Sequence, residues 1–189
     1  MKTDFSRDEL VALIPQIEQI EDAALRDKVV KAWELAYQYG NFENLKTARF
    51  NPFCDYVTLC QHTRSVTEGS ICLAKILQKE YQYDIDMDAV ISIAALHDIS
   101  KLLENTPKED GGIQKTEVGR SYQHGFFSAY YSLQAGLPHK ISAAILAHTH
   151  QTKTLPTSLE GILVTYADLS DADAHRFYMG KTLHVSDLH

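Results

Sequence analysis

A histidine and an aspartate stand side by side in the most apolar stretch of the chain. Residues 93–101 read I-A-A-L-H-D-I-S-K, so His97 and Asp98 have neighbours that are typical of a protein core. An unpartnered carboxylate in such surroundings costs on the order of several kcal/mol or has to stay protonated. The pair therefore predicts a bound partner, and a metal ion is the partner that suits both side chains.

Other apolar helical segments each supply one more imidazole or carboxylate. These further candidate ligands are His62, His124, His148 or His150, and Asp168 in the segment L-V-T-Y-A-D. Separate helices of a bundle can project such side chains into one interior point, and imidazole with carboxylate suits first-row transition ions. A single histidine on a helix is more often a hydrogen-bonded residue, so the prediction depends on the joint pattern. Asp171 and Asp173 are interpreted as a solvated face.

Helical periodicity runs through nearly the whole chain. A first helix is opened by the capping box of Ser6 and Glu9 and interrupted by Pro15. Further helices are expected over residues 22–39, 58–81, 87–104, 122–135, 138–148 and 157–175. The segment 41–57 is interpreted as a connector and 105–121 as a mobile loop or lid. With no convincing strand pair, the predicted fold class is an all-α, single-domain helical bundle.

Length and composition favour one soluble globular domain of 189 residues, 44% hydrophobic and 23% charged. The net charge of -7 argues against binding a nucleic-acid polymer, which needs clustered Lys and Arg. Three cysteines without a C-x-x-C pair predict a reducing, cytoplasmic location. The start of the chain lacks the apolar region of a signal peptide, and the apolar window Ala89–Leu96 is too short to span a membrane.

The order of His62, His97-Asp98 and Asp168 resembles the HD-domain superfamily of metal-dependent phosphohydrolases. The similar segments are Q-H-T-R-S-V, A-A-L-H-D-I-S-K with its H-D-x-x-K centre, Q-H-G-F-F-S-A, I-L-A-H-T-H and S-L-E-G-I-L-V-T-Y-A-D. The resemblance covers about residues 56–175, which are expected to form the metal-binding domain. Residues 1–55 would then be an N-terminal helical extension that packs on this core, and 176–189 a short, frayed C-terminal tail.

The resemblance implies two divalent transition-metal ions, with Fe, Mn, Co, Ni or Zn as the candidate metals. The implied ligands of the first ion are His62, His97, Asp98 and Asp168; Asp98 would bridge to the second ion, which His124 and His148 complete. Neighbouring helical residues point about 100° apart, so His97 and Asp98 can reach adjacent positions. Two ions about 3.5–4 Å apart can hold a bridging hydroxide. The expected reaction is hydrolysis of a phosphomonoester or phosphodiester, with a nucleotide as the expected substrate.

Candidate substrate contacts are less well defined than the ligands. Lys101 lies four residues after His97 on the same helical face; it is expected to contact a phosphate and act in catalysis, with a surface lysine as an equal alternative. The remaining candidates are His150, Arg120, Lys153 and Arg176. Nothing in the sequence selects among these.

Two other functions fit the same pattern. One is a mixed-valent di-iron oxygenase of the HD type, which uses the same six ligands. The other is a non-catalytic module that binds a nucleotide or a regulatory partner, in which residues 1–55 would serve as a docking or dimer surface. The complete ligand set favours an enzyme, and a homodimer is left open.

Overall fold

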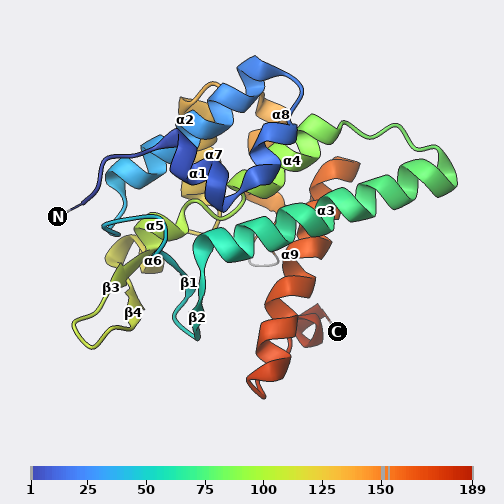
Figure 1. Cartoon of the computed structure of the whole chain (residues 1–189). Coiled ribbons are helices and arrows are strands. Elements are labelled where there is room, and N and C mark those ends of the chain that lie inside the picture. Colours follow the sequence, from blue (N-terminus) through green and yellow to red (C-terminus); the bar gives the residue numbers. More distant parts are fainter. Residues whose placement is uncertain (1, 150–151, 153, 189) are drawn as a thin grey trace.

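The computed structural model describes residues 2–149, 152 and 154–188 and shows a bundle of helices with short β-hairpins at one end (Figure 1). The α-helices are α1 (Arg7–Leu13), α2 (Ala23–Tyr39), α3 (Leu59–Tyr81), α4 (Met87–Leu96), α5 (Lys101–Glu104), α6 (Glu117–Ser121), α7 (Phe126–Gln134), α8 (His139–Ala147) and α9 (Leu159–Tyr178). The 3-10 helices are η1 (Pro15–Gln19) and η2 (His184–Leu188). The prediction of an all-α fold is confirmed.

Local sequence signals set the ends of the N-terminal helices. The Ser6 side chain accepts a hydrogen bond from the backbone N–H of Glu9 and caps α1. Pro15 then begins the 3-10 helix η1, because its ring is not compatible with continuing α1. Gly40 ends α2, where a Cβ atom would lie 2.9 Å from the Leu102 backbone oxygen and side chain. Close packing of α2 against the α5 region therefore requires glycine.

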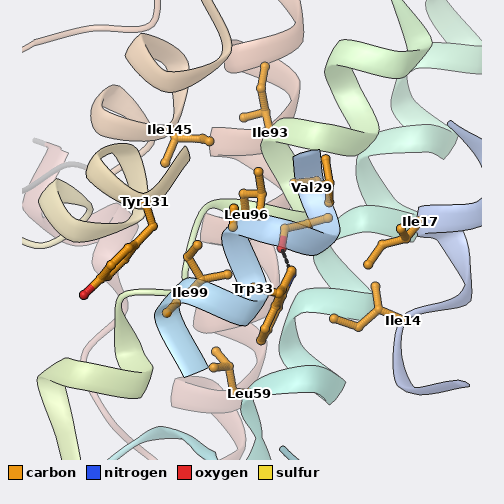
Figure 2. Packing of buried hydrophobic residues seen from close by; sticks show 14 of the residues in the cluster. Ile14, Ile17, Val29, Trp33, Leu59, Ile93, Leu96, Ile99, Tyr131 and Ile145 are labelled. Atoms are coloured by element: carbon orange, nitrogen blue, oxygen red, sulfur yellow. Dashed lines mark hydrogen bonds between the residues drawn. The ribbon is translucent and has the colours of Figure 1, made fainter. Parts of the chain in front are cut away.

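Helix α4 lies at the centre of the core, and every residue from Ala89 to Leu96 is buried. It packs against α2, α3, α8 and α9, and α3 and α9 cross beside it (Figure 1). Trp33 from α2 is fully buried, and its indole N–H donates to the backbone oxygen of Ala95 over 2.9 Å (Figure 2). Large aromatic side chains dominate the energetics of protein cores, and this hydrogen bond joins α2 to the C-terminal end of α4.

The N-terminal segment shares this core. Ile14 and Ile17 belong to the same buried cluster as Trp33 and Leu96, and Figure 2 shows Ile14 and Ile17 beside Trp33. In the described part of the chain, no helix is both long enough and apolar enough to cross a membrane.

The expectation of no strand pair is wrong. Strand β1 (Arg49–Asn51) pairs with β2 (Cys54–Thr58) inside the expected connector. Strand β3 (Asn105–Pro107) pairs with β4 (Ile113–Lys115) inside the segment expected to be a loop, which continues into α6. Both pairs are antiparallel, and their strands are too short to show the alternation that identifies a strand in a sequence.

Two helix starts also differ from prediction. Helix α9 begins at Leu159 and not at residue 157, because the Ser158 hydroxyl accepts from the N–H of Gly161 and caps the helix. Helix α7 begins only at Phe126, because Gly125 has a φ of 87° and a left-handed conformation that ends the preceding turn.

Candidate metal centre

Side chains from five parts of the bundle meet at one buried point beside the end of α4. The residues are His62 in α3, His97 and Asp98 directly after α4, His124 before α7, His148 at the end of α8, and Asp168 in α9. Four of these, His62, His97, Asp98 and His148, are almost completely inaccessible to solvent. The six ligands implied by the sequence are thus brought together.

The chain turns between α4 and α5, so the prediction of one helix over 87–104 is wrong. Helix α4 ends at Leu96, and residues 97–100 form tight turns in which the N–H of Lys101 donates to the oxygen of Asp98 over 3.0 Å. Because α4 is apolar on all sides, its pattern of hydrophobic residues does not indicate where it stops. The turn releases His97 and Asp98 from the regular helix beside the cluster.

One group of potential ligand atoms surrounds Nε2 of His62. This nitrogen lies 3.1 Å from Nε2 of His97, 3.2 Å from Oδ1 of Asp168 and 3.4 Å from Oδ2 of Asp98. Nε2 of His97 lies 3.7 Å from the same Asp168 oxygen. Atoms that bind one ion at about 2.0–2.2 Å stand roughly 3–3.5 Å from each other. The spacing therefore suits one shared cation.

A second group meets at the other oxygen of Asp98. Nε2 of His124 lies 2.8 Å from Oδ1 of Asp98, and Nε2 of His148 lies 3.9 Å from it. Nε2 of His148 also lies 4.0 Å from Oδ2 of Asp168. The two sets that could hold an ion are His62, His97 and Asp98, and Asp98, His124 and His148. Asp98 thus faces the two sets with different oxygens.

Hydrogen bonds on the outer sides of the rings leave the inner nitrogens available. Nδ1 of His97 donates to the backbone oxygen of Ala94, and Nδ1 of His148 to that of Ile145, each over 2.6 Å. A neutral ring that donates through Nδ1 has its lone pair on Nε2. Nε2 of His148 and Oδ1 of Asp98 are buried without a well-oriented hydrogen bond among the described residues. A buried acceptor without a donor, such as Nε2 of His148, is costly, and a divalent transition-metal ion fits between this nitrogen and the Asp98 oxygen that faces it.

The surrounding charges keep the carboxylates ionised. Burial alone would raise the pKa of Asp98, but the positive charges of Lys101 and His124 hold it well below its ordinary value. Burial would also raise the pKa of Asp168, and hydrogen bonds from His62 and His97 instead hold that pKa well below its ordinary value. Both carboxylates are therefore ready to bind a cation at neutral pH.

The imidazoles divide into two kinds. Burial opposes the charge on His62, yet its hydrogen bonds to acidic partners, Asp168 first among them, raise its pKa well above the ordinary value. Burial and the charge of Lys101 lower the pKa of His124. The carboxylates of Asp98 and Glu104 have the larger effect and raise this pKa to about 9. Burial and the neighbouring His97 lower the pKa of His148 to about 4. Without an ion, His62 and His124 hold protons, whereas His148 is neutral.

Comparison with known proteins identifies the family of the chain. The HD domain family matches residues 59–173. The chain belongs to the HD-domain family. This confirms the resemblance that the histidine and aspartate motifs indicated.

A relative of this HD-domain chain carries a specific activity in its name. The dihydroneopterin 2',3'-cyclic phosphate phosphodiesterase of Methanocaldococcus jannaschii is 29% identical over 115 residues, which are 60% of this chain and 46% of the relative. The HD-domain chain thus aligns with less than half the length of that relative. No solved structure matches the chain significantly.

The predicted substrate contacts of the HD domain have different outcomes. Lys101 is buried, with Nζ 3.4 Å from Nδ1 of His124, so the surface alternative is wrong. The guanidinium of Arg120 donates to the backbone oxygen of Lys115, and that of Arg176 to Thr182; these bonds hold them locally, and no described contact joins either to the cluster. His150 and Lys153 lie outside the described residues.

Three residues next to the candidate ligands were not predicted. Asp171, interpreted as part of a solvated face, lies with Oδ2 2.8 Å from Nδ1 of His62, which corrects that interpretation. Its position three residues after Asp168, on one helical face, was the available signal. Oε1 of Glu104 lies 2.9 Å from Nδ1 of His124, and the ring of Phe50 stacks on His62 at 3.7 Å between centroids. Phe50 had no signal, because it comes from an unpredicted hairpin.

Proposed function

We propose that the chain is a phosphohydrolase that uses two divalent transition-metal ions to cleave a phosphoester bond in a small molecule. The observation that carries this proposal is the pair of potential ligand sets that share only Asp98 and face its two oxygens. A carboxylate between two groups of imidazole nitrogens suits a bridged pair of ions, once the protonated rings have lost their protons. Membership of the HD-domain family supports the same conclusion.

The residues of the chain take distinct roles in this proposal. His62, His97 and Asp168 would hold one ion with Asp98, and His124 and His148 the other. Bound ions of this kind supply an activated water and offset the negative charge of a phosphoryl group. Lys101 would hold a phosphoryl oxygen, since its buried ammonium lies beside His124 and is kept charged: burial alone would lower its pKa, but Asp98 and Glu104 raise it.

The substrate proposal takes its direction from the relative. That protein is named for hydrolysis of a cyclic phosphodiester of a pterin. We therefore propose a small phosphodiester as the substrate class of this chain, with cyclic phosphates of pterins and of nucleosides as the first compounds to test. The net charge of -7 does not oppose this substrate, because bound divalent ions reverse the sign of the local field.

The test is a hydrolysis assay with the full-length protein, loaded separately with Mn²⁺, Fe²⁺, Co²⁺, Ni²⁺ or Zn²⁺. The compounds would include 2',3'-cyclic and 3',5'-cyclic nucleotides, a pterin cyclic phosphate and simple phosphomonoesters. The proposal expects metal-dependent product release from at least one ester. The exposed His139 provides the matched control: His139→Ala should keep the activity that His148→Ala loses. Inactivity of metal-loaded protein on every ester would contradict the proposal.

Oxygen consumption in the same assay distinguishes the oxygenase alternative. A hydrolase forms its product at the same rate with or without oxygen, and a cyclic phosphodiester gives a ring-opened phosphomonoester. Turnover of a polyol or phosphonate that stops under nitrogen would instead identify a di-iron oxygenase. Stoichiometric binding of a nucleotide without turnover would identify a non-catalytic module.

A further inference from the structure

Asp171 holds the outer side of His62. Its Oδ2 accepts from Nδ1 of His62 over 2.8 Å, and its Oδ1 accepts the hydroxyl hydrogen of Ser65 over 2.5 Å. Asp171 lies one helical turn after Asp168 on α9, so one helix supplies both a candidate ligand and the support of another. The Asp171 side chain is only 14% exposed.

This contact fixes which nitrogen of His62 faces the cluster. An ionised carboxylate only accepts hydrogen bonds, so Nδ1 of His62 must carry a proton. When no second proton is present, the lone pair is then on Nε2, which is the atom that points toward His97 and Asp98. A carboxylate behind a ligating imidazole also makes the ring a stronger donor to a metal ion.

Glu104 supports His124 in a different electrostatic setting. Its Oε1 lies 2.9 Å from Nδ1 of His124, but the ammonium of Lys101 lies 3.7 Å from its other oxygen. The same ammonium lies 3.4 Å from Nδ1 of His124. A fixed positive charge here offsets the charge of Glu104 and repels a cation bound at the second ligand set.

Among the described residues, no lysine or arginine is paired with Asp171. Within the described ranges, its ion partners are histidines: His62 and, at 3.6 Å, His175. The set around His62 is therefore supported by a carboxylate that forms no ion pair with a lysine or arginine in the described part of the chain. In the set around His124, the supporting carboxylate of Glu104 also forms an ion pair with the buried Lys101.

We infer that Asp171 is a positioning residue that makes the ion held by His62 and His97 the more tightly bound of the two. This inference rests on the proposed two-ion centre. It adds that the site at His62 and His97 binds its ion first, and that Asp171 causes this order. Removing a support of this kind typically weakens metal binding about 10–100-fold.

The test is titration of chelator-stripped, full-length protein with Co²⁺ in competition with a chromophoric chelator, combined with visible absorption spectra of the bound ion. The wild type should bind two ions in separate steps. Asp171→Asn keeps an acceptor for Nδ1–H and should weaken the first step about tenfold, whereas Asp171→Ala should weaken it up to about 100-fold. The spectrum of the first-bound ion should change in Asp171→Ala, and the second step should stay close to that of the wild type.

Two further variants separate positioning from simple packing. Ser65→Ala removes the other hydrogen bond of Asp171 and should leave both steps unchanged. Glu104→Gln should alter the second step and leave the first intact. Circular dichroism measures whether each variant is folded. If Asp171→Ala does not fold, Asp171→Asn, whose side chain has nearly the same shape, is used for the test in its place.

The outcomes distinguish this inference from the proposed function. If the wild type binds two ions but both Asp171 variants take up the first with wild-type affinity, the inference is wrong and the two-ion centre stands. Equal weakening of both steps, or a loss in Ser65→Ala as large as in Asp171→Ala, would also overturn it. A wild type that binds no Co²⁺ would overturn the metal centre and the inference together.

Discussion

Nε2 of His62 lies 3.1 Å from Nε2 of His97 at the centre of the ligand cluster. The Nδ1 atoms of both rings are occupied by acceptors, Asp171 for His62 and the backbone oxygen of Ala94 for His97. Two lone pairs at this distance repel each other unless a positive species lies between them. That species is a proton on His62 in the metal-free protein and, in our proposal, a metal ion in the loaded protein.

Metal loading should therefore release protons. At neutral pH the metal-free protein holds a proton on His62, whose pKa is well above its ordinary value, and on His124, whose pKa is about 9. Both rings must lose that proton to bind an ion. Isothermal titration with Zn²⁺ in buffers of different ionisation enthalpy should give a release of roughly two protons. A heat of binding that is the same in every buffer would contradict this assignment.

The stability of chelator-stripped protein should be greatest near the ordinary histidine pKa of 6.5. The raised pKa of His124 contributes stability that is fully present below 6.5 and is lost as the pH rises through about 9. His148, with a pKa of about 4, contributes stability that is present above 6.5 and lost as the pH falls toward 4. Each effect is on the order of 3 kcal/mol.

Urea unfolding across this pH range, with a chelator present, measures the effect. Bound metal should move the maximum to higher pH, because ions bind neutral imidazoles. A stability of the stripped protein that rises steadily with pH from acid to alkaline conditions would be inconsistent with the pKa shifts of His124 and His148.

Trp33→Phe should destabilise the fold without touching a ligand. The substitution leaves a small cavity and deprives the buried oxygen of Ala95 of its donor. We expect a loss of about 2–4 kcal/mol in the free energy of unfolding. Tyr178→Phe, at a side chain 87% exposed, is the control and should change it by less than about 0.5 kcal/mol. Equal stability of the two variants would show that this contact does not fix α4.

Asp98→Asn should abolish turnover and leave the helical fold mostly intact. The amide keeps the size of the side chain but removes the charge that faces both ligand sets. Because bound ions supply several kcal/mol to phosphoryl transfer, kcat should fall by more than about a thousandfold. Asp84→Asn, at an exposed position, is the control. Retention of full turnover by Asp98→Asn would refute the role of Asp98.

The side chains that meet at the cluster could be named from the sequence, because the motifs carry these residue types in a fixed order. Their geometry was less predictable. The break after Leu96 was missed because α4 is apolar on all sides, and a uniform apolar run does not mark its own end. Asp171 was misassigned because an acidic residue on an amphipathic helix is usually solvated, and only the tertiary contact with His62 shows otherwise. The contact of Phe50 with His62 depends on a hairpin whose strands are too short to predict.

The predicted substrate contacts were less accurate than the predicted cluster residues, because their positions depend on tertiary contacts. Arg120 was a reasonable candidate by charge, but its guanidinium is used locally by the backbone of Lys115. Lys101 was predicted by its helical spacing from His97, and it lies beside the cluster even though the chain turns between the two. The predicted position of Lys101 near the cluster was therefore correct, but it results from the turn after Leu96 and not from a continuous helix.

Anomalous diffraction from crystals of the protein loaded with Mn²⁺ or Fe²⁺ would test directly whether two ions bind at this cluster. We expect two peaks, one between His62, His97 and Asp168 and the other beside His124 and His148, with one oxygen of Asp98 bound to each. Absence of anomalous density at this cluster in metal-soaked crystals, or a single ion that Asp98 does not contact, would contradict this expectation.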